Sequence, residues 1–256
     1  MDGNQFDLRN ASGQKIVGLL NLPGGLERPL PPIILVHGLK GFMRMPMLEM
    51  LANSLVKLGY AVYRFDGTDG IGESSGNIFD STVTHYLGDL SVVLDYVSQQ
   101  PDLNLEKLSV FGTSMGGLVA TLAAGRDPRI KRLITHSAAF DWNILRQHPD
   151  IIDWREGEWI EFVSKSKGVR IKVGFDLFTD GIKYNAYKVL RQLPIPKLFM
   201  HSGQDEAIPV EFSKRAFREA AEPKKLVIID SASHNITNSG LVEKLAYEIS
   251  IFLNLV

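Results

Sequence analysis

The sequence predicts an α/β fold with a mostly parallel central sheet of about eight strands, helices on both faces and a small cap insertion. Three observations predict it. Short apolar runs recur without the alternation of a half-exposed strand, which is typical of parallel strands covered on both faces. Segments with helical spacing lie between most of these runs, as right-handed βαβ units require. One long stretch, residues 139–195, interrupts the pattern.

The apolar runs have the length and composition of buried strands. They are IILVHG (33–38), AVYRFD (61–66), LSVFG (108–112), RLITHSA (132–138), KLFMHSG (197–203) and LVIID (226–230). We expect helices where apolar residues recur every three or four positions. These stripes cover residues 47–58, 87–97, 118–123, 212–220 and 241–253.

Residues 5–30 precede this alternation and predict a pair of edge strands. QFDLRN and KIVGLLNL flank the turn sequence SGQ, as in a hairpin. Pro29, Pro31 and Pro32 then lead into the first buried strand.

Residues 139–195 are longer than a crossover between parallel strands needs, and they hold all three tryptophans of the chain. Two alternating runs flank Asp180-Gly181 in VGFDLFTDGIKYNAY, so we expect a hairpin there. Neither end has the composition of a linker. The prediction is an α/β core of residues 1–138 and 196–256 with a cap insertion of residues 139–195.

The composition of the 256-residue chain, 45% apolar and 22% charged, is that of an ordinary globular protein. A net charge of −1 gives no electrostatic reason to expect nucleic acid or an anionic membrane as a partner. The lack of cysteine excludes disulfides, thiolate zinc sites and a cysteine nucleophile. There is no signal-peptide pattern, and no apolar run approaches the ~20 residues of a membrane span. We therefore expect a soluble cytoplasmic protein, monomeric or homodimeric, without stable membrane insertion.

The stretch VFGTSMGGLVA, residues 110–120, contains a candidate nucleophile, Ser114. It joins a strand to a helix, and Gly112 and Gly116 stand where backbones meet too closely for a Cβ. A serine in such a turn projects its hydroxyl beyond the carboxyl end of the strand, where open α/β sheets bind ligands. The alternative is a small residue in a tight turn.

A serine nucleophile needs a general base that is oriented by an acid. His234 lies in DSASHN, after the last expected strand, and Asp205 follows the preceding strand in HSGQDEAIP. The chain order Ser114, Asp205, His234 matches a triad order known on α/β sheets. Two alternatives stay open: Glu206 as the acid, and a role for His234 in capping the last helix.

Acyl transfer also needs hydrogen-bond donors for the developing oxyanion. The N–H of Met115 follows the serine at a helix N-terminus, where the helix dipole favours negative charge. The second donor is expected in the loop after the first buried strand, residues 37–41. Leu39 N–H is the candidate, with Gly38 allowing close approach, and Lys40 is the next candidate.

The motifs HGLKG, DGTDGIGESSG, GTSMGG, DEAIP and ASHN together resemble those of the α/β-hydrolase family. The resemblance covers residues 5–256 apart from the cap. Within the family the chain is most similar to the small-cap serine esterases, the cinnamoyl/feruloyl esterase-like and monoacylglycerol-lipase-like group. This implies hydrolysis of carboxylic esters through an acyl-enzyme on Ser114, without metal or cofactor. Asp69 and Ser202 depart from the family pattern, and Asp69 is expected to reshape the pocket rim.

The substrate pocket is expected under the cap, because a cap has to cover a serine at the sheet edge. Candidate lining residues are His37, Phe140, Trp142, Trp154, Trp159, Phe175 and Phe178. For the aromatic residues the alternative is a small core of the cap itself. For His37 the alternative is a structural role, in which it hydrogen-bonds the backbone and shapes the oxyanion hole. We expect His136 and His201 as satisfied polar groups or pocket lining, and His148 as a surface or cap residue.

The sequence thus predicts a serine carboxylesterase acting on a small-molecule ester. The same triad can serve a peptidase, amidase, thioesterase or acyltransferase, because leaving-group preference depends on the cap. A non-catalytic binding module on this fold is the alternative of another class.

Overall fold

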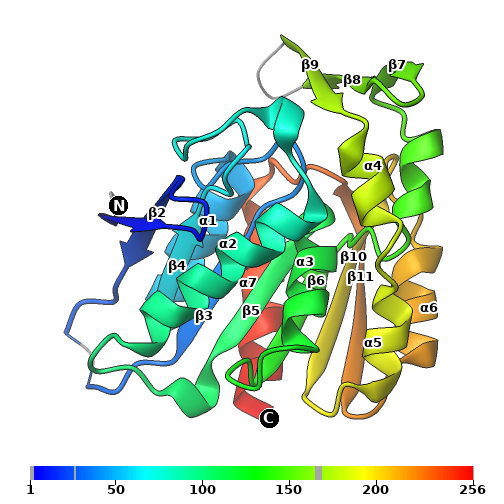
Figure 1. Ribbon diagram of the computed structural model, residues 1–256. Coiled ribbons are helices and arrows are strands. Elements are labelled where there is room, and N and C mark those ends of the chain that lie inside the picture. The colour runs from blue at the N-terminus through cyan, green and yellow to red at the C-terminus, as the bar shows by residue number, and fades with distance from the viewer. Residues whose placement is uncertain (1–2, 26, 165–168, 256) are drawn as a thin grey trace.

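Eight strands form the central sheet of the computed structural model, which describes residues 3–25, 27–164 and 169–255 (Figure 1). Their order across the sheet is β1-β2-β4-β3-β5-β6-β10-β11. Pairings from β4 to β11 are parallel, whereas β2 is antiparallel to both β1 and β4. The predicted fold class, a mostly parallel α/β sheet, is confirmed.

The strands lie on the apolar runs of the sequence. Their bounds are β1 (Asn4–Arg9), β2 (Lys15–Asn21), β3 (Pro32–Val36), β4 (Ala61–Phe65), β5 (Ser109–Thr113), β6 (Arg132–His136), β10 (Lys197–Gln204) and β11 (Lys224–Ser233). β1 and β2 form the expected hairpin, with β1 at the edge of the sheet. Every residue of β3, β4, β5 and β6 is buried, which explains why these runs show no polar alternation.

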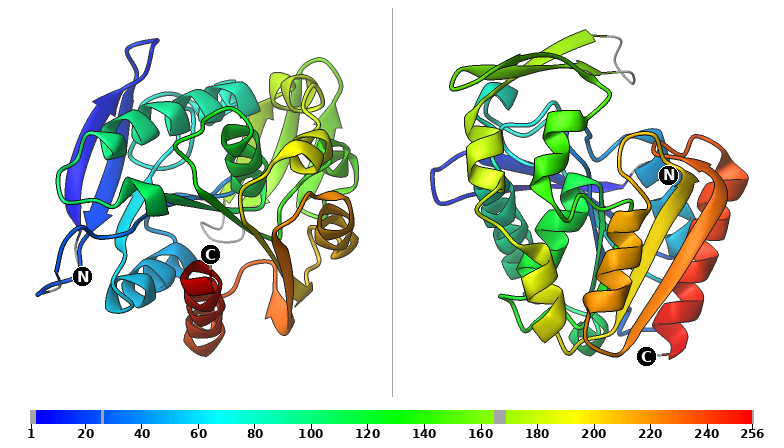
Figure 2. Two further views of the ribbon diagram at one scale, coloured as in Figure 1. Left: turned by 90° about the horizontal axis from the view of Figure 1, so that it is seen from below. Right: turned by 90° about the vertical axis from the view of Figure 1, so that its right-hand side faces the viewer.

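Helices cover both faces of the sheet (Figure 2). They are α1 (Pro46–Lys57), α2 (Val83–Ser98), α3 (Met115–Ala124), α5 (Ala186–Gln192), α6 (Glu211–Glu219) and α7 (Ser239–Leu255), with short 3-10 turns η1 (Ile78–Asp80) and η2 (Leu105–Lys107). α1 and α7 pack together on one face, while α2 and α3 pack on the other. Each face of the sheet has its own hydrophobic core, and successive residues of β3 point into one or the other. Ile33 and Leu35 face the core that contains α1, and Ile34 and Val36 face the core that contains α3.

The chain between β6 and β10 is the region predicted to be a cap, and it extends beyond the main sheet at the upper right of Figure 1. Its elements before α5 are η3 (Trp142–Gln147), β7 (Ile151–Arg155), β8 (Trp159–Ser164), β9 (Val169–Gly174) and α4 (Asp176–Gly181). β7, β8 and β9 form a separate antiparallel sheet. α5 packs against α3 and α6, so this end of the region joins the helical layer beside the central sheet. The division at residues 139 and 195 stays a prediction.

The hairpin predicted around Asp180-Gly181 is wrong, because these residues end α4. Tertiary contacts explain the difference. The Asp180 carboxylate accepts hydrogen bonds from the N–H (2.8 Å) and the hydroxyl (2.7 Å) of Thr84 in α2. A Cβ on Gly181 would overlap the ring of Trp142, so this glycine allows a close contact at the end of a helix. The hairpins of the cap instead join β7 to β8 and β8 to β9.

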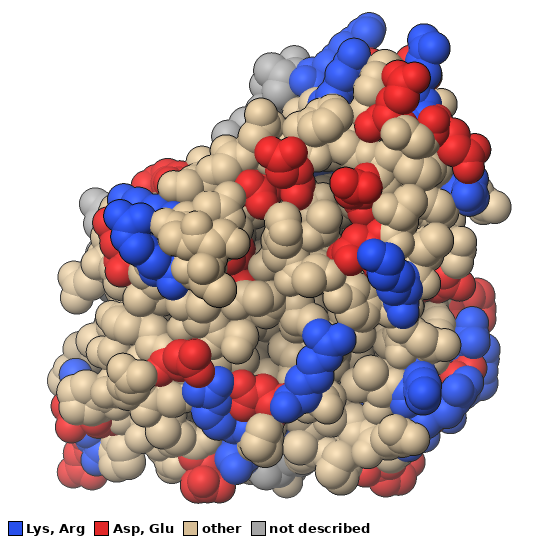
Figure 3. Space-filling view, viewed as in Figure 1, with Lys and Arg blue, Asp and Glu red and all other residues tan. Residues whose placement is uncertain are grey.

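Side chains of both charges are interspersed over the face seen in Figure 3, in line with 28 Lys and Arg against 29 Asp and Glu in the chain. Within the described ranges, every helix is too short or too polar to cross a membrane.

Replacing Gly116 with alanine should destabilise the protein, because the new Cβ would overlap the carbonyl oxygens of Val36 and His37. We expect the free energy of unfolding, measured by urea denaturation, to fall by about 1–3 kcal/mol or more. Gly88→Ala in α2 is the control, since beyond its chain neighbours and the adjacent helix backbone no atom of the described residues would lie within 4 Å of the new Cβ. The free energy of unfolding of Gly88→Ala should rise by about 0.5–1 kcal/mol. A Gly116→Ala variant as stable as the wild type would contradict this account of the turn.

Candidate active site

Ser114 stands at the sharp turn between β5 and α3, with φ 53° and ψ −121°. A non-glycine residue in such a conformation is strained by about 1–3 kcal/mol and persists only where its surroundings fix it. Here the Ser114 N–H donates to the carbonyl of His136 (3.0 Å). The Ser114 carbonyl in turn accepts from the N–H groups of Gly117 (3.0 Å) and Ala139 (3.1 Å). These bonds hold the serine at the pocket.

The two glycines beside Ser114 allow three backbones to meet. A Cβ on Gly112 would overlap the carbonyl of Gly116, and a Cβ on Gly116 would overlap the end of β3 at Val36. The absence of a side chain at both positions is therefore a steric requirement, as the sequence predicts.

Asp205 and His234 lie in the loops that follow the adjacent parallel strands β10 and β11. His234 Nδ1 lies 2.8 Å from Asp205 Oδ2, and Oδ1 accepts from the N–H groups of Ala207 (2.9 Å) and Ile208 (2.8 Å). Burial raises the pKa of Asp205, but the hydrogen bond and charge of His234 and the Ile208 N–H outweigh it and lower the pKa to about 2. Asp205 is therefore ionised at neutral pH and orients the His234 ring.

Glu206, the alternative acid, is exposed to solvent. Its carboxylate lies 3.5 Å from the backbone N–H of His234, whereas the imidazole contacts Asp205. The geometry thus favours Asp205.

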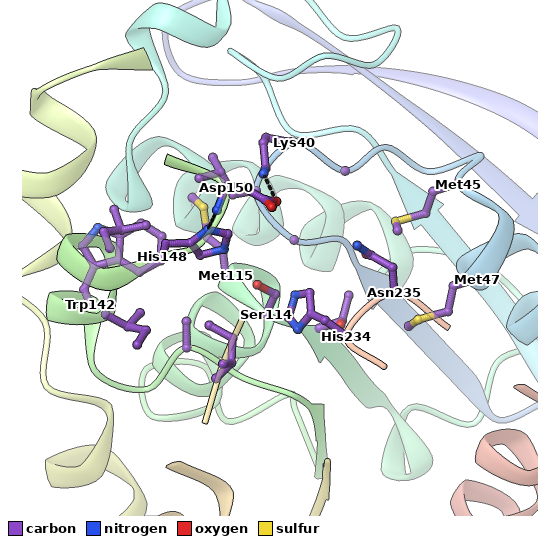
Figure 4. Close-up of a pocket in the computed structure, with 18 residues that line it drawn as sticks. Lys40, Met45, Met47, Ser114, Met115, Trp142, His148, Asp150, His234 and Asn235 are labelled. Carbon is purple, nitrogen blue, oxygen red and sulfur yellow. Dashed lines mark hydrogen bonds and ion pairs between the residues drawn. The ribbon is translucent and has the colours of Figure 1, made fainter. Parts of the chain in front are cut away.

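Ser114 and His234 line the same pocket, and Figure 4 shows their side chains next to each other. The structure therefore brings all three predicted triad residues together, although Ser114 is far from the other two in sequence. A hydroxyl beside an imidazole that a carboxylate orients is the arrangement required for nucleophilic attack.

The loop after β3 contacts the serine directly. A Cβ on Gly38 would lie 2.9 Å from Ser114 Cβ. The Gly41 N–H donates to the Gly38 carbonyl (2.9 Å), which closes a turn with Leu39 and Lys40 at its centre. Lys40 has a positive φ of 59°. We call residues 38–41 the oxyanion loop.

The predicted oxyanion donors belong to residues that line the same pocket as the serine, Leu39 in the oxyanion loop and Met115 in α3. Met115 is the first residue of α3, so its N–H has no acceptor within the helix. This placement is compatible with the predicted roles, which stay predictions.

His37 holds the start of the oxyanion loop and lines a smaller hollow next to the pocket. Its Nδ1 donates to the Gly38 carbonyl (2.8 Å), and its Nε2 accepts from the Gly67 N–H (3.2 Å). The Tyr86 hydroxyl donates to the His37 carbonyl (3.1 Å). Burial lowers the pKa of His37 and keeps the ring neutral, as the bond from Gly67 requires. The structural alternative for His37 therefore fits better than pocket lining.

The main pocket lies between a wall from the core and a wall from the cap. Figure 4 shows Met45 and Met47 on one side of Ser114, and Trp142 and His148 on the other. Most lining side chains are apolar, which is typical of a small-molecule site.

Of the aromatic residues predicted to line this pocket, the structure places only Trp142 there. Phe140 instead lies in the core, where its ring centroid is 5.8 Å from that of Tyr187 and 6.0 Å from that of Phe199. Phe140 lies four residues after the end of β6, and its ring packs against residues of α5 and β10.

The remaining aromatic residues also lie away from the pocket lining. Trp154, Phe175 and Phe178 pack on one another with centroid distances of 5.1, 5.5 and 5.6 Å. Trp159 lies under the amine of Lys172, 3.9 Å from the ring centroid. The alternative of a small core within the cap fits the first three.

Several residues that line the pocket were not predicted to do so: Lys40 as a side chain, Met45, Met47, His148, Asp150, Ile208 and Asn235. Met47 belongs to a helical stripe that predicts burial only, and His148 was expected at the surface or in the cap. Lys40, Ile208 and Asn235 carried a signal, because they belong to the motifs HGLKG, DEAIP and ASHN.

His136 and His201 are satisfied polar groups. His136 contacts the hydroxyls of Thr113 (3.2 Å) and Ser202 (3.0 Å), and burial lowers its pKa to about 3. His201 contacts the hydroxyl of Ser213 (2.8 Å). Ser202, one of the two departures from the family pattern, thus serves as a partner for a buried histidine.

Asp69, the other departure, lies outside the described pocket lining, so its expected place at the rim is not observed. Its buried carboxylate contacts His85 Nδ1 (2.9 Å) and accepts from Gln14 Nε2 (3.0 Å). Among the described residues, no cluster of three or more acidic or histidine side chains is arranged to hold a metal ion.

A family model described as serine aminopeptidase, S33, matches residues 28–165, which is more than half of the chain and includes Ser114. The chain belongs to the S33 family. The predicted membership of the α/β-hydrolases is thereby confirmed.

Curated relatives match most of this S33 chain. It is 24% identical over 263 residues to an uncharacterized 31.7 kDa protein from the traX-finO intergenic region of Escherichia coli, covering 87% of this chain and 89% of the relative. It is 27% identical over 216 residues to the mitochondrial palmitoyl-protein thioesterase ABHD10 of Mus musculus, covering 80% of this chain and 68% of the relative.

Solved structures share the fold of this S33 chain. Est1E from Butyrivibrio proteoclasticus, with ferulic acid bound, has a TM-score of 0.82 at 23% identity and covers 98% of this chain and 100% of its own. The esterase domain of a Rhodothermus marinus protein has a TM-score of 0.77 at 20% identity and covers 98% of both chains.

The low pKa of Asp205 predicts a pH-dependent contribution to stability. The folded pKa of about 2 lies below the ordinary 3.8. The contribution is therefore fully present above about pH 4–5 and is lost as the pH falls toward 2, in total about 2–3 kcal/mol. Urea denaturation at several pH values should show that the free energy of unfolding falls more steeply with decreasing pH in the wild type than in Asp205→Asn, which has no titrating carboxyl at this position. Parallel pH profiles would contradict the low pKa of Asp205.

Proposed function

We propose that this S33 hydrolase cleaves carboxylic esters through an acyl-enzyme on Ser114. The observation that carries the proposal is the strained turn that presents Ser114 beside His234, whose Nδ1 is 2.8 Å from the carboxylate of Asp205. The oxyanion loop and the start of α3 support it, because both line the pocket of the serine and carry N–H groups that can stabilise a developing negative charge.

In the acylation step, the Ser114 oxygen attacks the ester carbonyl and His234 Nε2 takes the hydroxyl proton. Asp205 stabilises the imidazolium that forms. The N–H groups of Leu39 and Met115 stabilise the oxyanion of the tetrahedral intermediate. Collapse breaks the bond to the alkoxy oxygen, and His234 returns the proton to the leaving alcohol.

In the deacylation step, water attacks the acyl-enzyme while His234 again acts as the base. The bond between the acyl carbon and the Ser114 oxygen breaks, and the serine recovers its proton. The products are a carboxylic acid and the free enzyme. Neither step requires a metal or a cofactor.

A thioesterase is the second candidate, because the chain is 27% identical to a palmitoyl-protein thioesterase over 80% of its length. It would use the same acyl-enzyme with a thiolate as the leaving group. Esters, thioesters and aminoacyl amides with matched acyl groups separate these activities. We expect the highest kcat/KM with esters, and a clear preference for thioesters or amides would replace the proposal with that chemistry.

Ser114→Ala should fold normally and lose ester turnover by about 10⁴-fold or more, because no other group replaces the nucleophile. Turnover of p-nitrophenyl butyrate and labelling by a fluorophosphonate probe measure the loss. Ser12→Ala, in the exposed turn between β1 and β2, is the matched control and should keep full activity.

An active Ser114→Ala variant would contradict the proposed mechanism. A wild-type protein that folds but reacts with neither the ester nor the probe would instead fit a non-catalytic binding module.

A further inference from the structure

We propose that Lys40 and Asp150 are positioning residues that couple the cap to the oxyanion loop. The inference rests on the proposed function, because it concerns the same site. The Lys40 amine lies 2.8 Å from Asp150 Oδ2 and so joins a loop of the core to the cap. Figure 4 shows this ion pair at the pocket, close to Ser114.

The ion pair is largely shielded from solvent, with side-chain exposures of 12% for Lys40 and 13% for Asp150. The Lys40 amine also donates to the carbonyl of Val163 in β8 (3.3 Å) and lies 5.0 Å from the ring centroid of Phe162. At this depth, removing one member of the pair costs more free energy than at the surface, because the remaining charge loses a counterion 2.8 Å away. The pair therefore fixes the position of the cap relative to the oxyanion loop.

On the cap side, the backbone of Asp150 is held from two directions. Its N–H donates to Nδ1 of His148 (3.2 Å), and its carbonyl accepts from the N–H of Val163 (2.9 Å). Burial lowers the pKa of His148 to about 4, so the ring is neutral and Nδ1 is free to accept. Asp150 is thus a fixed anchor.

On the core side, the ion pair acts on a strained backbone position. Lys40 is the third residue of the turn closed by Gly41 N–H and Gly38 O, and its φ is 59°. A positive φ at this position favours glycine or asparagine, and lysine is strained there by about 1–3 kcal/mol. The backbone conformation at Lys40 sets the direction of the peptide group between Leu39 and Lys40, which carries the Lys40 N–H, the next candidate donor. It also sets the form of the turn that begins at Gly38 and includes the Leu39 N–H. An anchored Lys40 side chain therefore stabilises one form of the turn.

The Lys40–Asp150 contact should affect the rate of the chemical step. The same turn contains Leu39, whose N–H is the proposed donor, and Gly38, which touches Ser114. The position of the cap and the form of the turn that carries the Leu39 N–H are thus set together by one contact. Loss of the contact should lower kcat more than it weakens substrate binding, because donors aimed at the oxyanion act mainly in the transition state.

The test compares Lys40→Ala with Lys40→Gly, using p-nitrophenyl acetate as a small substrate. Both variants remove the ion pair, but only glycine accepts a positive φ without strain. We expect Lys40→Ala to lower kcat by about tenfold or more, less than the ~10²–10³-fold effect of losing a donor outright. Lys40→Gly should recover most of that loss, with KM changed little in either variant.

Asp150→Asn removes the cap partner and should lower kcat as Lys40→Ala does. The double variant Lys40→Ala/Asp150→Asn should be no slower than the worse single variant, since the two changes break one interaction. Urea denaturation confirms that each variant is folded.

The matched control is Lys225→Ala, which breaks an ion pair with Glu248 (3.0 Å) whose members do not line the pocket. It should leave kcat unchanged. Equal kcat values for Lys40→Ala and Lys40→Gly, or an effect on KM alone, would overturn the coupling while leaving the proposed function intact. A wild-type protein that neither hydrolyses the ester nor reacts with a fluorophosphonate would overturn both.

Discussion

The close approach of three backbone segments at Ser114 is the constraint on which the rest of the site depends. β5, α3 and the end of β3 meet there, with Gly112 against Gly116 and Gly116 against Val36. Because no side chain fits between them, the turn has little freedom, and Ser114 is held at φ 53°. The same packing brings the first N–H of α3 and the oxyanion loop to the serine. One steric requirement thus arranges the nucleophile and both candidate donors.

The order of the parallel strands, rather than close backbone packing, places Asp205 and His234 near the serine. Parallel strands end at one edge, so the loops after β10 and β11 lie side by side there. Asp205 is then fixed by N–H groups of its own loop as well as by His234, so its carboxylate keeps its position without a ligand. Preorganisation of this kind is what an electrostatic role in a transition state requires.

The cap forms the other wall of the pocket, and long-range polar contacts hold it to the core. Asp180 of α4 binds Thr84 of α2, and Asp150 binds Lys40 of the oxyanion loop. The cap also has an apolar cluster of its own, formed by Trp154, Phe175 and Phe178. In sequence, Asp150 precedes this cluster and Asp180 follows it. The region therefore has a small core of its own, while its place over Ser114 depends on side chains of the main domain.

By itself, the sequence determined the order of strands and helices in the core and the grouping of Ser114, Asp205 and His234, because each of these residues comes two to four positions after an apolar run that marks a strand. Only the tertiary structure decided the lining of the pocket. Asp180-Gly181 has the local pattern of a hairpin, yet contacts with Thr84 and Trp142 place it in a helix. Local patterns encode burial and turns, but which cap side chain faces the serine depends on packing between segments far apart in the chain.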